Sequence, residues 1–239
     1  MPVLAVGLVV LATGCGSEAT PPAQSSSQRA AAPAPLQACP SADGGWEALP
    51  TSGYYRPRAA RLGSGPLGVV FANDSDNETC VWAGEARALA GEGYAVAVFE
   101  TAGAYEADET RAAAAALRRS GTRRIALIGA SVGARAVLQV AAQRPRGVAG
   151  VVALSAERRI SSNPSDLLPI ARRIRVPVLS IGSRGDPLTS FGKDTPAWDR
   201  AIPDGRALIL SGGDHGVDFL TDRHRRRVRA AILGFLRSL

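Results

Sequence analysis

From residue 67 onward, short apolar runs rich in β-branched residues alternate with longer, Ala-rich stretches. This alternation predicts parallel strands joined by helical crossovers. The apolar runs are nearly continuous, as a strand requires when helices cover both faces of its sheet. The pattern therefore predicts an α/β fold with a doubly wound, mostly parallel sheet flanked by helices. The expected strands are 67–72, 94–99, 124–129, 150–154, 177–182 and 206–210.

The stretches between these strands predict helices at 80–91, 107–120, 133–143, 165–174 and 217–239. Residues 45–62 are expected to add one or two antiparallel edge strands, although Pro57 and several glycines weaken the pattern there. Only 22 residues, 155–176, separate two of the predicted strands, and a predicted helix uses ten of them. No cap domain fits into that connection, so we expect an open site.

The first 35 residues differ from the rest of the chain. Residues 1–13 form an uncharged apolar stretch, too short to span a bilayer but of the length of the hydrophobic region of a secretion signal. Residues 16–35 are mainly Ser, Ala, Pro and Gln without hydrophobic periodicity, which indicates a flexible tether. We therefore expect a signal peptide at 1–14, a tether at 15–35 and one folded domain at 36–239.

The small residues before Cys15 resemble the end of a bacterial lipoprotein signal. In such signals the cysteine is lipidated and becomes the new N-terminus, so the resemblance implies an exported protein anchored to the cell membrane through Cys15. An ordinary cleaved signal, which would leave an extracellular protein, is the alternative.

The chain has three cysteines, an odd number. If Cys15 carries lipid, Cys39 and Cys80 remain as one pair, and an oxidising compartment would allow them to form a disulfide. There is no CxxC motif and there are only two histidines, so we expect no zinc or other metal site.

Composition limits the class of protein further. A chain of 239 residues with 46% hydrophobic and 21% charged residues suits one globular domain and excludes a disordered or multi-span membrane protein. The net charge is +7, but the basic residues are scattered and no recognition motif accompanies them. We therefore expect no nucleic-acid partner, and we favour attraction to an anionic envelope surface.

The first candidate for a catalytic site is the sequence Gly-Ala-Ser-Val-Gly at 129–133, between a predicted strand and a predicted helix. In such a G-x-S-x-G turn, Ser131 lies in a strained bend, and Gly129 and Gly133 remove the Cβ atoms that would collide there. The turn is also a helix N-terminus, so the Val132 N–H is free to donate to a developing oxyanion. A glycine-rich turn with an incidental serine is the structural alternative.

A serine nucleophile needs a base and an orienting carboxylate. We expect His215 to be the base, because it lies in a loop after the last strand, whereas His224 is expected in mid-helix among arginines on a solvated face. Asp186 follows the preceding strand, so it and His215 would meet Ser131 at the carboxyl ends of the strands. Asp214 is the competing acid, but as the neighbour of the base it is interpreted as a turn residue.

Residues from about 67 to 239 resemble the α/β-hydrolases, in the chain order Ser131, Asp186, His215. The resemblance, which is to capless esterases of the dienelactone-hydrolase kind, implies that these residues are nucleophile, acid and base. It also implies a second oxyanion donor in the loop after the first parallel strand, where the family's His-Gly is missing. The N–H of Ser75 or Asp74 is the candidate there.

These features predict a secreted or lipid-anchored serine hydrolase that cleaves a small-molecule or lipid-like ester through an acyl-enzyme, without a cofactor. A peptidase or amidase with the same triad is one alternative. A non-catalytic envelope protein that uses the same fold for binding is the other, since fold does not fix function.

Overall fold

The computed structural model describes residues 46–51, 56–74, 79–101, 106–160, 165–221 and 223–239. All of them belong to one compact unit, Ala34–Leu239. The predicted signal peptide and tether with Cys15, as well as Cys39 and Ser75, lie outside the described residues.

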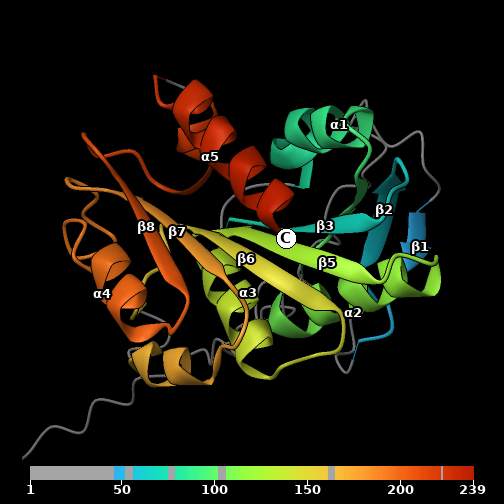
Figure 1. The fold of residues 1–239 in the computed structure, drawn as a ribbon, viewed down its shortest axis with the longest axis horizontal. Coiled ribbons are helices and arrows are strands. Elements are labelled where there is room, and N and C mark those ends of the chain that lie inside the picture. Colours follow the sequence, from blue (N-terminus) through green and yellow to red (C-terminus); the bar gives the residue numbers. More distant parts are fainter. Residues whose placement is uncertain (1–45, 52–55, 75–78, 102–105, 161–164, 222) are drawn as a thin grey trace, which may run out of the picture. The chain divides into compact units, whose positions relative to one another are not determined.

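The described chain forms one eight-stranded sheet in the order β1-β2-β4-β3-β5-β6-β7-β8 (Figure 1). β1 and β2 pair in antiparallel fashion with each other, and β2 pairs in the same way with β4, whereas every pair from β4 to β8 is parallel. The strands are β1 Trp46–Ala48, β2 Arg58–Leu62, β3 Leu67–Ala72, β4 Ala95–Phe99, β5 Arg124–Ala130, β6 Val148–Leu154, β7 Val178–Ser183 and β8 Gly205–Leu210.

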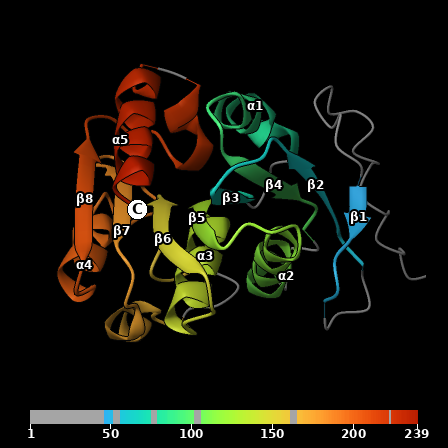
Figure 2. The ribbon, with the colours of Figure 1, turned by 45° about the vertical axis from the view of Figure 1, so that its right-hand side comes forward.

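Helices cover both faces of this sheet (Figures 1 and 2). α1 and α5 lie on one face, and α2, α3 and α4 lie on the other. The α-helices are α1 Ala83–Gly91, α2 Glu106–Arg119, α3 Val132–Ala142, α4 Asp194–Ala201 and α5 Arg225–Ser238, and the short 3-10 helices are η2 Thr79–Trp82, η3 Leu168–Arg173 and η4 Gly216–Leu220. α2 has acidic residues in its first turn and arginines in its last, which suits the helix dipole.

The two faces of each central strand pack into two separate hydrophobic cores. In β3, Val70 contributes to the core beneath α2 and α3, whereas Val69 and Phe71 contribute to the core beneath α1 and α5. The Phe71 ring stacks on Trp82 with 4.6 Å between the ring centroids. The central strands are thus apolar on both sides because both sides are covered.

The predicted fold class is confirmed, and so are the two antiparallel edge strands in 45–62. The six predicted parallel strands lie within two residues of their predicted ends. The expectation that each is buried on both faces is wrong for β8, where Arg206 and Ala207 are exposed. β8 is the last strand of the sheet, and no other strand of the described residues pairs with its outer side.

The helix predictions are less accurate. The helix expected at 165–174 is only the 3-10 helix η3, and the helix expected at 217–239 divides into η4 and α5. α4 was not predicted, because its sequence is only eight residues long and carries Pro196. The described part of the connection from β6 to β7 contains η3 alone and no cap domain.

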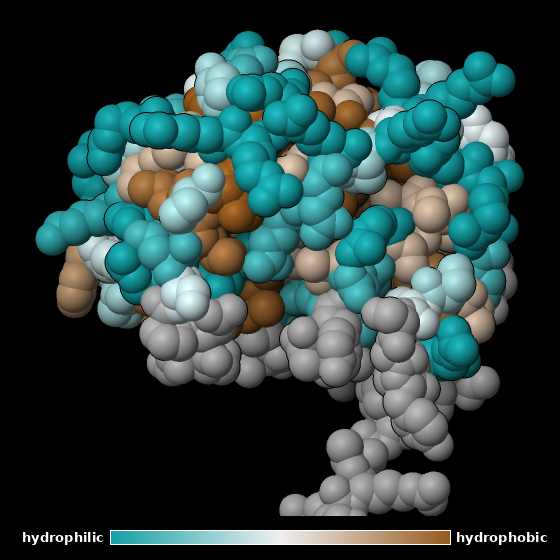
Figure 3. Space-filling model, turned by 90° about the horizontal axis from the view of Figure 1, so that it is seen from below, coloured by the Kyte–Doolittle hydropathy of each residue, from teal (hydrophilic) through white to brown (hydrophobic). Residues whose placement is uncertain are grey.

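Figure 3 shows the molecule from the side of α2, α3 and α4, where hydrophilic residues surround separate apolar patches. Among the described residues, no helix combines the length and apolarity needed to cross a membrane.

Candidate active site

Ser131 lies in the turn between β5 and α3, at a φ of 50° and a ψ of −113°. A positive φ is rare for a residue with a Cβ and is sustained only where the surroundings enforce it. A Cβ added to Gly129 would lie 2.3 Å from the carbonyl oxygen of Gly133, and one added to Gly133 would lie 2.3 Å from that of Asn73. The two glycines are therefore required by close backbone packing, which is the reason expected from the sequence.

Val132 is the first residue of α3, so its N–H has no acceptor within the helix. The contact between Gly133 and the carbonyl of Asn73 brings this helix end against the loop that follows β3. Asn73 is anchored there by its side-chain amide, which donates to the Phe99 carbonyl at 3.0 Å. Asp74 follows it and is buried, whereas Ser75, the other candidate donor, lies outside the described residues.

Asp186 and His215 meet in the loops that follow β7 and β8. Nδ1 of His215 lies 2.7 Å from Oδ2 of Asp186, whose side chain has no exposed surface. The other carboxylate oxygen of Asp186 accepts the backbone N–H of Leu188 at 3.0 Å. Nε2 of His215 is buried and has no hydrogen-bond partner among the described residues.

The loop that carries His215 is held against the elbow of Ser131. The N–H of Gly216 donates to the hydroxyl of Ser155 at 3.0 Å, directly after β6. A Cβ added to Gly216 would lie 2.2 Å from Oδ2 of Asp74 and 3.6 Å from Cβ of Ala130. The residue after the predicted base thus lies beside the residue before the predicted nucleophile, so the structure brings the three predicted residues to one edge of the sheet.

Glu157 is a site residue that the sequence analysis missed. Its Oε1 accepts the hydroxyl of Ser131 at 3.4 Å, and the side chains of both residues are buried. Arg135 of α3 donates to the backbone carbonyl of Glu157 at 3.0 Å. Only its position along the chain could have indicated Glu157 as a site residue. It follows β6 by three residues, at the edge of the sheet where the other site residues lie.

The charges around His215 favour its protonated form. Burial acts against the imidazolium, but the hydrogen bond and charge of Asp186, together with the charges of Asp74 and Glu157, outweigh burial and raise the pKa of His215 above its ordinary value. Burial alone would raise the pKa of Asp186, yet the contact with His215 and the N–H of Leu188 lower it. The pair is therefore a carboxylate beside a basic imidazole.

Glu157 experiences opposing effects. Burial raises the pKa of its carboxyl, while the charge of His215, the hydroxyl of Ser131 and the charge of Arg135 reduce that rise. Arg135 in turn is shared between Glu157 and Asp194, whose charges act against the burial that lowers its pKa.

The competing residues have other contacts. Asp214 lies 3.4 Å from Arg223 and 3.6 Å from Nε2 of His224. His224 itself precedes α5, and its Nε2 lies 2.9 Å from the carbonyl oxygen of Ser211, so its expected place in mid-helix is wrong. The helix begins later than predicted, which frees His224 to pack against the loop.

The loop after Asp186 displays apolar side chains. Leu188 and Phe191 are 56% and 68% exposed and are the large hydrophobic residues that the described chain leaves open to solvent. Ser190, Phe191 and Gly192 all have positive φ, so this loop follows an unusual left-handed path.

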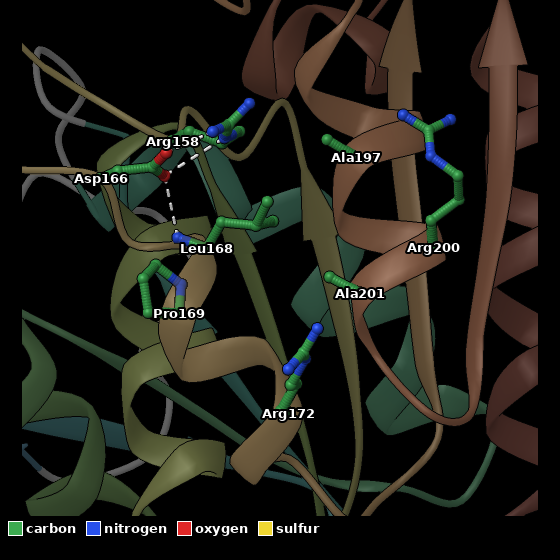
Figure 4. A pocket seen from close by; sticks show the side chains of 8 residues that line it. All are labelled: Arg158, Asp166, Leu168, Pro169, Arg172, Ala197, Arg200 and Ala201. Carbon is green, nitrogen blue, oxygen red and sulfur yellow. Dashed lines mark hydrogen bonds and ion pairs between the residues drawn. The ribbon is translucent and has the colours of Figure 1, made fainter.

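A separate hollow of about 700 Å³ lies between η3 and α4 (Figure 4). Asp166 pairs there with Arg158 and also with Arg159, so part of its cationic lining is neutralised. The lining residues are Arg158, Asp166, Leu168, Pro169, Arg172, Ala197, Arg200 and Ala201. None of the predicted nucleophile, acid and base lines this hollow.

No protein-family model matches the sequence, and no curated protein matches it. Solved structures do resemble the fold. A proline iminopeptidase from Mycobacterium smegmatis has a TM-score of 0.66 at 14% identity, over 81% of this chain and 98% of its own. A thermophilic esterase from Thermogutta terrifontis has a TM-score of 0.65 at 16% identity, over 81% and 98% of the two chains. A monoacylglycerol lipase from Paleococcus ferrophilus has a TM-score of 0.64 at 16% identity, over 77% and 99%.

The chain has the α/β-hydrolase fold. In this fold the sites lie outside the carboxyl ends of the strands, which is where Ser131, Glu157, Asp186 and His215 lie. The order Ser131, Asp186, His215 along the chain is also that of the α/β-hydrolase triads.

Proposed function

We propose that the protein is a serine hydrolase that cleaves a carboxylic ester by acyl transfer. The observation that carries this proposal is the strained turn at Ser131, against which the loop with the buried Asp186–His215 pair is packed. A serine hydroxyl becomes a nucleophile when a neighbouring base accepts its proton, and a carboxylate that fixes the tautomer of that base completes the arrangement.

In the proposed reaction, the Ser131 hydroxyl turns from Glu157 toward Nε2 of His215 when substrate binds. Its oxygen attacks the ester carbonyl while its proton passes to His215. The N–H of Val132 and that of Asp74 or Ser75 stabilise the resulting oxyanion. The tetrahedral intermediate expels the alcohol, which takes the proton from His215, and leaves an acyl-enzyme. Water, deprotonated by His215, then releases the acid and restores Ser131.

Fluorophosphonate labelling tests the proposal, because the reagent reacts with activated serines. We expect wild-type protein to be labelled at Ser131 and to hydrolyse p-nitrophenyl acetate, and Ser131→Ala to do neither. A folded wild-type protein that is neither labelled nor active would instead be a non-catalytic binding protein on the same fold. A peptidase or amidase would be labelled too, and would be distinguished by measurable turnover of an amide that has the same acyl group as the ester.

We also propose that the enzyme is exported and anchored by lipid on Cys15, and that Cys39 pairs with Cys80. The small residues before Cys15 and the tether after it support the anchor. Acyl chains contribute about 0.8 kcal/mol per buried CH₂, and more than one chain is needed for stable anchoring. Detergent partitioning of wild type against Cys15→Ser tests it. We expect only the wild type in the detergent phase, whereas both in the aqueous phase would indicate an ordinary secreted enzyme.

A further inference from the structure

We propose that Glu157 selects the acyl group of the substrate by binding an ammonium group on the carbon next to the scissile carbonyl. The preferred substrates would then be amino-acyl compounds. This inference rests on the proposed function, because it takes Ser131 as the nucleophile.

The first support is position. Oε1 of Glu157 lies 3.4 Å from the oxygen of Ser131 that would attack the carbonyl. In a reactive complex the carbonyl carbon lies about 3 to 3.5 Å from that oxygen. A substituent on the next carbon of the acyl group is two bonds further away, and it can therefore reach hydrogen-bond distance of Oε1.

The second support is that the triad does not need this carboxylate. Nδ1 of His215 is already paired with Asp186 at 2.7 Å, so Glu157 is not its orienting acid. A buried carboxylate is costly to maintain unless it is paired, and Arg135, one of the cationic groups that act on Glu157, donates its hydrogen bond to the backbone carbonyl of Glu157. An ammonium group of the substrate would supply a direct partner.

The third support is the charge of the whole site. The carboxylates of Asp74, Asp186 and Glu157 all act on His215, and Asp194 shares Arg135 with Glu157. Arg135 and His215 are the cationic groups that act on Glu157. Carboxylates grouped around His215 in this way favour a cationic acyl group over one that carries a carboxylate.

The test compares three methyl esters of similar shape: alanine methyl ester, methyl isobutyrate and the monomethyl ester of methylmalonic acid. Their acyl groups carry an ammonium, a methyl and a carboxylate at the same position. The enzymes are wild type, Glu157→Gln, and Glu47→Gln as a control that removes a carboxylate from β1. Rates are followed by acid release near neutral pH, where the amino ester is cationic.

We expect wild type and Glu47→Gln to prefer the alanine ester over methyl isobutyrate at least tenfold in kcat/KM. In Glu157→Gln that ratio should fall at least tenfold, mainly through KM for the alanine ester, and the ratio of the anionic to the neutral ester should rise. Using ratios cancels any effect of the substitution on His215 that all three substrates share.

The inference is overturned if wild type turns over the neutral ester as well as the amino ester, or if Glu157→Gln leaves both ratios within twofold. Either result leaves the serine hydrolase intact, because the neutral ester is still cleaved and Ser131 is still labelled by fluorophosphonate. If wild type cleaves no ester and takes no label, the proposed function and this inference fall together.

Discussion

Oδ2 of Asp186 lies 2.7 Å from Nδ1 of His215, and the carboxylate has no exposed surface while the ring is 16% exposed. Because water is excluded from the acid, the contact fixes the ring orientation and leaves Nε2 as the nitrogen available for proton transfer.

Ser131→Ala should abolish hydrolysis of an activated ester, with a loss on the order of 10⁴ to 10⁶ in kcat, because only binding and oxyanion effects remain. His215→Ala should behave similarly. His224→Ala should stay within a few fold of wild type, since its Nε2 contacts the carbonyl of Ser211 rather than the site. Steady-state kinetics on p-nitrophenyl acetate measures all three. If the two histidine variants exchange outcomes, the base has been misassigned.

The rate should rise with pH through the pKa of His215 and then level off, because the base must be neutral. Neighbouring carboxylates raise that pKa, so the acid limb should lie above the ordinary histidine value. Asp74→Asn removes one of the charges that favour the imidazolium, and it should move the acid limb to lower pH. The pH dependence of kcat/KM for a neutral ester measures this. A limb that stays in place or moves upward would contradict it.

Glu106→Gln should stabilise the protein at neutral pH. Burial, followed by the charges of Glu109 and Asp74, raises the pKa of Glu106 well above its ordinary value. The folded state then binds a proton more tightly than the unfolded state, so its stability falls as the pH rises above the unfolded pKa. The neutral variant avoids this loss, so we expect a gain in stability at pH 8 that shrinks toward pH 4. Thermal unfolding at both pH values provides the measurement. An equal or larger gain at pH 4 would exclude ionisation as the cause.

Gly133→Ala should reduce both stability and activity. The added Cβ would lie 2.3 Å from the Asn73 carbonyl oxygen and 2.5 Å from that of Ala72, so the elbow and the oxyanion loop must separate. Such overpacking costs about 1 to 3 kcal/mol. Gly234→Ala in α5 is the matched control, because nothing lies within 4 Å of its added Cβ, and it should stabilise by about 0.5 to 1 kcal/mol. Chemical denaturation measures the free energy of unfolding of both variants. A Gly133→Ala variant as stable as wild type would refute the packing argument.

The Cys39–Cys80 disulfide should be found in protein exported from its host. Cys80 lies in η2, whereas Cys39 lies outside the described residues, so the pairing stays a prediction. On the chain-entropy model a closed loop of about 40 residues stabilises by roughly 3 to 4 kcal/mol. Non-reducing peptide mapping gives the answer, and the finding that both thiols can be alkylated without reduction would refute the pairing.

The sheet could be predicted from the sequence because its central strands are buried on both faces and read as continuous apolar runs. β8 is also an apolar run, but two of its residues are exposed. The burial of a strand depends on what packs against it and not on its own sequence. α4 was harder to predict, because it is short and is held by a tertiary contact: Trp198 is fully buried and donates to the carbonyl of Ala156 at 2.9 Å. Such tertiary contacts leave no periodic signal in the local sequence.

For the site, the residues with a local motif were the easier ones to predict. Ser131 lies in a turn that requires the glycines on either side of it. The chain has only two histidines, so few candidates for the base had to be compared. Glu157 has no motif around it, and only the approach of the β6 and β5 ends brings its carboxylate to Ser131.

The distribution of the site along the chain bears on how the protein is synthesised. Ser131 follows β5, but its partners follow β7 and β8, and the loop with His215 is held in place by Ser155 after β6. Because synthesis runs from the N-terminus, residues of the strands β3 to β6 are made before the base at His215. Under the proposed function, activity therefore arises only when nearly the whole domain has been translated and folded, and incomplete chains carry a serine at the elbow that cannot react.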